Sequence, residues 1–256
     1  MLIDTHAHLD QSEFDTDRDE AVARALAAGV ETIVCVAVNA DSSAAILELA
    51  GRYPQIRATA GIHPNYAAQV SADDWDRVCE FARAGSVVGL GETGLDRHWD
   101  YTPFDVQQDY FGRHLELSRE TGLPFIVHCR ESEADVLAML RESFRSGPLV
   151  GVMHSFSGDW AFAEECLAMG MYISFAGMVT FKKSDALRAV AAQIPADRIL
   201  VETDSPYLSP HPLRGKRNEP ANVRLTAECV AAARGETLED FARQTTENAR
   251  RLFRLS

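Results

Sequence analysis

The sequence contains no run of about 20 apolar residues, which is the length that a membrane-spanning helix needs. Its first residues, MLIDTHAHLD, have neither a basic segment nor an apolar one, so no secretory signal is evident. We therefore expect no membrane segment and a cytoplasmic location. Low-complexity stretches, long linkers and close internal repeats are also missing, so we expect one domain over residues 1–256. Because no exposed apolar repeat is evident, we expect a monomer.

Cysteine is scarce and is not arranged in motifs. The five cysteines are Cys35, Cys79, Cys129, Cys166 and Cys229. An odd number without any close CxxC pair excludes a disulfide framework and a zinc knuckle. Most of them lie in apolar or helical surroundings, which predicts buried thiols and suits a reducing cytoplasm.

Basic residues are fewer than acidic ones, with 25 Lys and Arg against 38 Asp and Glu, which gives a net charge of −13. This balance argues against a broad basic face that binds long duplex DNA irrespective of sequence. It does not exclude an enzyme that acts on nucleic acids. A carboxylate-lined site for divalent cations adds negative charge, and the bound cations invert the local potential.

Short apolar runs alternate with longer segments of helical periodicity. We expect strands at Leu2–His8, Thr32–Val38, Arg57–Ile62, Ser86–Glu92, Pro124–His128, Leu149–His154, Met171–Phe175 and Arg198–Thr203. We expect helices at Asp17–Ala28, Ala40–Arg52, Ala72–Ala84, Phe104–Thr121, Glu133–Phe144, Trp160–Ala168, Ala186–Gln193, Val223–Arg234 and Leu238–Leu252. Strands that alternate with helices indicate an α/β protein with a parallel sheet. The length and the positions of the polar residues favour a single (β/α)8 TIM barrel over a doubly wound open sheet.

Histidines and carboxylates stand where the apolar runs end, and in a barrel these C-terminal ends meet on one rim. The candidates are His6, His8, His63, Glu92, His128, His154 and Asp204. His6 and His8 are two residues apart on a strand, so their side chains point the same way and can hold one cation. Apart from His63, these residues are six candidate ligands, which exceeds the needs of one tetrahedral ion. We assign His6, His8 and Asp204 to one ion, His128 and His154 to another, and Glu92 to a bridge between them.

This ligand set suits Zn, Mn and related divalent ions, while carboxylates alone suit Mg, so the identity of the two ions stays open. A water activated by metal is the expected nucleophile, and Asp204 is placed to orient it or take its proton. Glu92 is the second catalytic candidate, as the shared ligand. His63 is a candidate contact for substrate or phosphate. A mononuclear zinc site with three histidines and two carboxylates is a variant of this hypothesis.

Several motifs together resemble the TatD family of metal-dependent deoxyribonucleases, within the amidohydrolase-like barrels. They are IDTHAHLD at 3–10, GIHP at 61–64, GLGETGLD at 89–96, LPFIVHCRE at 123–131, HSFSG at 154–158, LVETDSPYLSP at 200–210 and LRGKRNEP at 213–220. The resemblance covers essentially the whole chain. It implies hydrolysis of DNA phosphodiester bonds, often as a 3′-5′ exonuclease on single strands, with Mg or other divalent ions. The bridging position that is a carbamylated lysine in many amidohydrolases looks like Glu92 here.

The resemblance also implies roles outside the ligand set. His63 and Arg130 look like phosphate-facing residues, and Glu202 looks like a group behind the ligands. Basic residues follow the last two strands and could receive a DNA backbone, namely Lys182, Lys183, Arg214, Lys216 and Arg217. Aromatic residues expected on the same face of the barrel are candidates for stacking on a base, namely Trp99, Tyr101, Phe181 and Tyr207.

Two alternatives remain at this point. The same metals and water could serve an esterase, lactonase or amidase that acts on a small molecule, although Glu92 in place of lysine and the RGKR loop weigh against it. A barrel without activity could act as a binding scaffold, although all six ligands are present. We therefore expect single-stranded DNA or nucleic-acid ends as the substrate.

Overall fold

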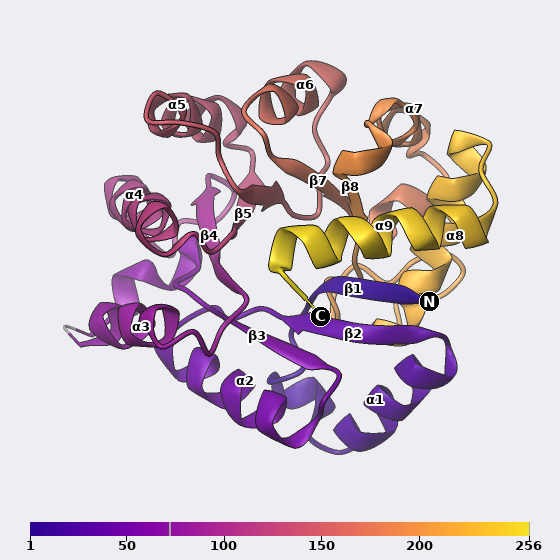
Figure 1. Cartoon of the computed structure of the whole chain (residues 1–256), viewed down its shortest axis with the longest axis horizontal. Coiled ribbons are helices and arrows are strands. Elements are labelled where there is room, and N and C mark those ends of the chain that lie inside the picture. The colour runs from indigo at the N-terminus through magenta and orange to yellow at the C-terminus, as the bar shows by residue number, and fades with distance from the viewer. Residues whose placement is uncertain (72, 256) are drawn as a thin grey trace. The chain divides into compact units, whose positions relative to one another are not determined.

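The computed structural model describes residues 1–71 and 73–255, in which eight parallel strands alternate with helices (Figure 1). This confirms the predicted α/β class and the (β/α)8 barrel fold. The strands are β1 (Leu2–Ala7), β2 (Val30–Cys35), β3 (Ile56–Ala60), β4 (Gly89–Asp96), β5 (Phe125–Arg130), β6 (Gly151–Met153), β7 (Tyr172–Phe175) and β8 (Ile199–Val201). The helices are α1 (Arg18–Ala27), α2 (Ala40–Arg52), α3 (Asp74–Arg83), α4 (Phe104–Thr121), α5 (Glu133–Phe144), α6 (Trp160–Ala168), α7 (Asp185–Gln193), α8 (Val223–Arg234) and α9 (Leu238–Phe253). Ala72, where one helix was expected to begin, lies outside the described residues.

Contacts between residues group the chain into two compact units. Unit 1 comprises Met1–Cys35, Ser155–Ala163 and the chain from Ile173 onward, and unit 2 comprises Val36–His154 and Glu164–Tyr172. In unit 1, β7 pairs with β8, β8 contacts β1, and β1 pairs with β2. In unit 2, β3, β4, β5 and β6 pair in chain order. Each unit therefore contributes a parallel sheet whose polar residues follow the strand ends.

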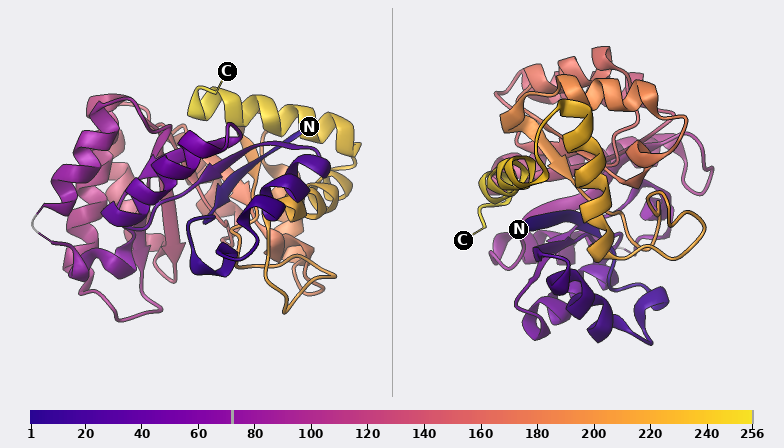
Figure 2. Two further views of the ribbon diagram at one scale, coloured as in Figure 1. Left: turned by 90° about the horizontal axis from the view of Figure 1, so that it is seen from below. Right: turned by 90° about the vertical axis from the view of Figure 1, so that its right-hand side faces the viewer.

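In unit 1 the last helix lies along the strands that carry polar residues. Figures 1 and 2 show α9 beside β1 and close to the N-terminus. Thr237 caps the start of this helix, because its side chain accepts a hydrogen bond from the backbone N–H of Asp240. Its buried face includes Phe241 and Phe253, and burying a side chain of that size stabilises the fold by about 1.5–3 kcal/mol. Asn248 on this face donates to the backbone oxygen of Ile199, which fixes the start of β8.

In unit 2 the strand β4 differs from the prediction. We expected Ser86–Glu92, but the strand begins at Gly89 and continues to Asp96. The reason is its pairing with β5, which extends to a partnership between Asp96 and Arg130. Gly94 makes this pairing possible, because a Cβ atom there would lie 2.1 Å from the backbone oxygen of His128. Its φ of 126° is also one that residues with a side chain rarely adopt.

The five cysteines are free thiols, and Cys35, Cys79 and Cys166 are buried as predicted. Cys129 and Cys229 are partly exposed. Burial raises the pKa of the Cys129 thiol to about 12, so it stays protonated near neutral pH. Among the helices of residues 1–71 and 73–255, none combines the length and the apolar character that crossing a membrane requires.

Candidate metal centres

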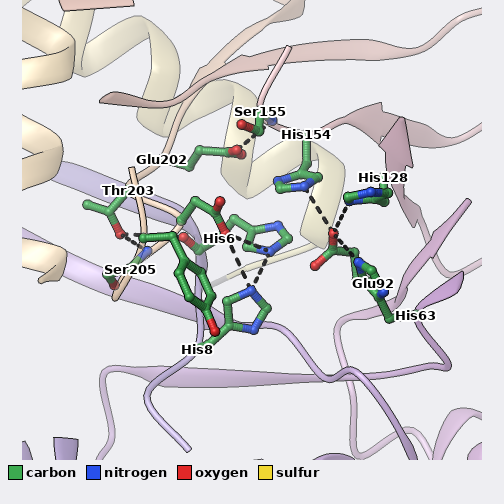
Figure 3. A network of polar contacts seen from close by, with 12 residues as sticks. His6, His8, His63, Glu92, His128, His154, Ser155, Glu202, Thr203 and Ser205 are labelled. Carbon is green, nitrogen blue, oxygen red and sulfur yellow. Dashed lines mark hydrogen bonds and ion pairs between the residues drawn. The ribbon is translucent and has the colours of Figure 1, made fainter. Parts of the chain in front are cut away.

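In unit 1, three side chains converge in what we name the His6 cluster, which comprises His6, His8 and Asp204. His6 lies in β1 and His8 directly follows it, and Figure 3 shows the two imidazoles turned toward each other. Asp204 comes shortly after β8. The Nε2 atoms of His6 and His8 are 3.1 Å apart. The Oδ1 atom of Asp204 lies 3.7 Å from Nε2 of His6 and 3.4 Å from Nε2 of His8. The two histidines are almost fully buried, and Asp204 is 13% exposed. The predicted pairing of two strand-end histidines with one carboxylate is therefore present in the structure.

The spacing of these three atoms suits a single cation. Ligands about 2.1 Å from an ion in tetrahedral geometry are separated from one another by roughly 3.4 Å. The observed separations of 3.1, 3.4 and 3.7 Å bracket that value. Two imidazoles and one carboxylate are also the donor types that Zn²⁺ and Mn²⁺ accept. The donor set of the His6 cluster therefore fits a divalent ion.

Asp204 is held in place by residues that the sequence analysis did not single out. The buried carboxylate of Asp4 accepts hydrogen bonds from the backbone N–H and the hydroxyl of Thr203, at 2.8 and 2.6 Å. The amide of Asn218 donates to the backbone oxygen of Thr203. Asp204 itself donates from its backbone to His6 and has a φ of 56°, which Asp tolerates better than most residues. Burial raises the pKa of Asp4 to about 8, although its bonds to Thr203 lower it.

In unit 2, three imidazoles surround one carboxylate in what we name the Glu92 cluster, which comprises His63, Glu92, His128 and His154 (Figure 3). The Oε1 atom of Glu92 lies 2.9 Å from Nδ1 of His128, 3.1 Å from Nε2 of His154 and 3.3 Å from Nε2 of His63. Glu92 is 3% exposed. These separations also suit ligands of one divalent ion. The cluster contains the strand-end residues predicted from the ends of β3 to β6.

Hydrogen bonds assign different roles to the histidines of this cluster. The backbone N–H of Asn65 donates to Nδ1 of His63 over 3.1 Å. A neutral His63 therefore carries its proton on Nε2, the atom that faces Glu92. An Nε2–H group donates hydrogen bonds and has no lone pair for a metal. Although its atoms lie close enough for coordination, the tautomer makes His63 a donor toward Glu92 or toward a bound anion.

His128 faces Glu92 with the other ring nitrogen. Its Nδ1 atom faces Glu92, and its Nε2 atom contacts Oδ2 of Asp96 at 2.9 Å. Burial alone lowers the pKa of His128, but hydrogen bonds to Asp96 and Glu92 outweigh it and raise the pKa. Burial by itself raises the pKa of Asp96, yet the bonds from His128, Trp99 and Asn65 lower it well below its usual range. Asp96 is therefore a buried carboxylate in its ionised form.

The remaining predicted residues lie in different surroundings. Glu202 is buried, and its Oε1 atom accepts a hydrogen bond from the backbone N–H of Ser155 over 2.6 Å. Arg130 is exposed, and its guanidinium lies 5.8 Å from the ring centre of Trp99. Arg217 donates to both carboxylate oxygens of Asp17, at 2.6 and 2.8 Å. The charge of Arg217 is thus neutralised by a neighbour, while that of Arg130 faces solvent.

Sequence reasoning missed Asp4 and Asp96, although a signal for each is present. Alternate residues of a strand point to the same side. Asp4 precedes His6 by two residues, and Asp96 follows Glu92 by four. Each carboxylate therefore shares a strand face with a predicted ligand. Apart from the backbone N–H of His6, which donates to Asp4, the donors to these two carboxyl groups are far away in the sequence or lie in loops, and no sequence pattern predicts them.

Comparison with known proteins places these clusters in context. The family model described as TatD related DNase matches residues 3–254. The chain is 43% identical over 256 residues to the uncharacterized metal-dependent hydrolase YabD of Bacillus subtilis (strain 168), with 100% of both chains covered. It is 37% identical over 261 residues to the 3′-5′ ssDNA/RNA exonuclease TatD of Pectobacterium parmentieri (strain WPP163), again with 100% of both covered. The solved structure of YJJV, a TatD homologue from Escherichia coli K12, matches with a TM-score of 0.93 at 29% identity, covering 100% of this chain and 98% of that one.

Proposed function

We propose that this chain, which belongs to the TatD related DNase family and is a metal-dependent hydrolase, cleaves single-stranded DNA. In this proposal the protein degrades the strand from its 3′ end. The observation that carries the proposal is the pair of His and carboxylate clusters with ligand spacing. A relative that covers the whole chain is named for 3′-5′ exonuclease action on single-stranded DNA and RNA. A nucleic acid is therefore the substrate class that we favour.

We further propose that each cluster holds one divalent ion. Nε2 of His6, Nε2 of His8 and Asp204 would hold the first. Nδ1 of His128, Nε2 of His154 and Glu92 would hold the second. That Glu92 is shared by both ions is our prediction from the sequence. When bound, such ions supply Lewis-acid activation of water and of the phosphoryl group. Mg, Mn and Zn are the candidates, because mixed imidazole and carboxylate ligands admit several of them.

The chain's own residues would then orient substrate and protons. Asp204 is the proposed general base, because its carboxylate is partly exposed and can accept a proton from a water at Oδ2 or Oδ1. His63 presents Nε2–H and is the proposed donor to a phosphate oxygen. Arg130 offers an exposed guanidinium for the flanking phosphate. Glu202 supports the site from behind by holding the backbone of Ser155.

Of the two alternative functions, a binding scaffold without activity is disfavoured, because the chain belongs to a hydrolase family and has the complete donor set. A small-molecule esterase, lactonase or amidase uses the same kind of site, so it remains the second candidate. The two enzymes differ in substrate rather than in ligands.

The experiment that tests the proposal is a nuclease assay with end-labelled single-stranded DNA and RNA. Purified protein is incubated with EDTA, Mg²⁺, Mn²⁺ or Zn²⁺, and each label is placed on the 3′ or the 5′ end. The Asp204→Asn variant keeps the shape of the side chain but loses the base. The matched control is Asp240→Asn, which removes a surface carboxylate of α9 that pairs with Arg243.

We expect metal-dependent shortening from the 3′ end that Asp204→Asn abolishes and Asp240→Asn leaves intact. Thermal unfolding of Asp204→Asn should match that of the wild type, because barrel stability does not depend on the rim. If metal-loaded protein leaves every nucleic acid intact but hydrolyses a lactone or an aryl ester, the small-molecule alternative replaces the proposal.

A further inference from the structure

Two aromatic rings stand exposed on the loop that follows β4. Trp99 and Tyr101 stack with ring centres 5.3 Å apart and planes 10° from parallel. Trp99 is 42% exposed and Tyr101 is 57% exposed. Phe14, Phe111 and other large rings are fully buried, which is the usual place for such side chains. An exposed and ordered aromatic pair is typical of a surface that binds another flat ring.

The loop that carries these rings is held firmly. Oδ1 of Asp96 accepts hydrogen bonds from the backbone N–H groups of His98 and Trp99, at 2.8 and 3.0 Å. Arg97 forms a two-point ion pair with Asp135 on α5, and its backbone N–H donates to the backbone oxygen of Arg130. The rings are therefore presented in a fixed position, so that a ligand need not order the loop before it binds.

A positively charged side chain next to the two rings indicates that the ligand also carries an anionic group. The guanidinium of Arg130 lies 5.8 Å from the centre of the Trp99 ring and is exposed. Arg130 ends β5 directly beside Asp96, and Asp96 also contacts His128 of the Glu92 cluster. A ligand with a flat ring and an anionic group, bound next to a metal ligand, has the chemistry of a nucleotide.

We propose that Trp99, Tyr101 and Arg130 form a binding subsite for one unpaired nucleotide. The base stacks on the face of Tyr101 that is turned away from Trp99, and the phosphate pairs with Arg130. A base within a duplex already has both faces stacked, so the subsite selects single strands over double strands. This inference rests on the proposed nuclease function and names the part of the chain that recognises the substrate.

The test is equilibrium binding, measured separately from cleavage. Fluorescence anisotropy of a short labelled oligothymidylate, in the presence of EDTA, gives the Kd of wild-type protein and of Trp99→Ala/Tyr101→Ala. The matched control is Phe144→Ala, which removes an exposed ring at the end of α5, where the chain leads toward the start of β6. A second probe is the same sugar-phosphate backbone without bases.

We expect the double variant to bind oligothymidylate about tenfold more weakly, the effect of losing one stacked base. Phe144→Ala should bind like the wild type, and the probe without bases should not distinguish the variants. Equal Kd values for wild type and double variant, or no binding by the wild type, would overturn the subsite. Failure of the nuclease proposal is recognised independently, as binding without cleavage in any metal.

A separate observation assigns a role to Asp96 within the Glu92 cluster. The geometry points to Asp96 as a positioning residue that orients His128. The Oδ2 atom of Asp96 lies 2.9 Å from Nε2, so this contact engages the ring nitrogen that is turned away from Glu92. The Nδ1 atom is then the nitrogen that faces Glu92, where a metal would be held. Asn65 donates to the same oxygen of Asp96 over 3.1 Å and fixes the carboxylate in turn.

This role predicts weaker metal binding when the carboxylate becomes an amide. Asp96→Asn should weaken Zn²⁺ binding at the Glu92 cluster by about 10–100-fold in a calorimetric titration, the usual effect of losing such a partner. In the Zn²⁺-loaded protein, side-chain nitrogen NMR of the histidines should show that His128 of the variant no longer donates from Nε2 to a carboxylate. Asp109→Asn, which makes the same change at a surface carboxylate of α4 that pairs with Arg113, serves as the control with unchanged Zn²⁺ affinity. If folded Asp96→Asn binds Zn²⁺ as the wild type does and His128 keeps its tautomer, Asp96 has no positioning role.

Discussion

The Nε2 atom of His63 lies 3.3 Å from Oε1 of Glu92 while its Nδ1 atom accepts a hydrogen bond from the backbone of Asn65. Distance alone would count His63 as a metal ligand beside Glu92 and His128. Because its proton is on Nε2, His63 instead donates a hydrogen bond from that atom. Replacing His63 should therefore affect catalysis but not metal binding.

We predict that His63→Ala keeps the metal content of the wild type and loses turnover. Removing one donor to a developing charge lowers kcat by about 10²–10³-fold. Plasma mass spectrometry of the purified variant, alongside nuclease kinetics, measures both quantities. His154→Ala is the control and should lose metal. Loss of metal from His63→Ala to the same extent would show that His63 is a ligand.

Metal stoichiometry tests the assignment of one ion to each cluster. The wild type should bind two equivalents, and the double variant His6→Ala/His8→Ala should bind one, because the Glu92 cluster keeps its donors. His211→Ala, which removes an exposed histidine of a loop, should retain both. The measurement is a calorimetric titration with Zn²⁺ or Mn²⁺. One equivalent in the wild type would favour the mononuclear variant of the site.

Stability should fall on mild acidification because of His114. This buried imidazole accepts from the backbone N–H of Ile62 and contacts the backbone oxygen of Tyr110. Burial lowers its pKa to about 4 from 6.5. The unfolded chain therefore binds more protons between these values, so the stabilisation is complete above pH 6.5 and is lost as the pH falls toward 4. The total is about 3 kcal/mol.

Urea unfolding between pH 7 and 4 in the presence of EDTA measures this effect. His114→Gln should lose less stability over that range than the wild type does. His211→Gln, whose imidazole is exposed, should follow the wild type. Parallel pH profiles for wild type and His114→Gln would contradict the assignment of this transition to His114.

Arg217 was predicted from the sequence to contact DNA, and its ion pair with Asp17 suggests a second role. Both side chains are 29% exposed, so we expect Arg217→Ala to lower the free energy of unfolding by about 1 kcal/mol or less. If Arg217 also contacts a phosphate, the variant loses that contact. The slope of log Kd for DNA against log salt concentration should then be smaller by about one. Arg224→Ala removes an exposed guanidinium of α8 that pairs with Glu228, and serves as the control. An unchanged salt slope would assign Arg217 to folding alone.

Much of the fold follows from periodicity along the chain. Helices α2, α4, α5, α6 and α8 have the predicted bounds, because their apolar spacing and their caps are local properties. Strand β4 was placed too early, since its end depends on how far β5 continues beside it. Periodicity locates a buried strand, and only the pairing decides its last residue.

The sequence by itself determined which polar residues were expected to gather, namely His6, His8, His63, Glu92, His128, His154 and Asp204. The expectation follows from the rule that parallel strands place their C-terminal residues together. That rule needs only the order of strands and the alternation of side chains, both of which are readable from the chain.

Only the tertiary structure decided what each of these groups does. The Nδ1 atom of His63 accepts a hydrogen bond from a backbone N–H of a loop, and the Nε2 atom of His128 contacts Asp96. The partner of Arg217 is a carboxylate 200 residues away in the sequence. Hydrogen-bond direction and charge pairing depend on distances of about 3 Å between atoms, and no spacing of residues along a chain specifies such distances.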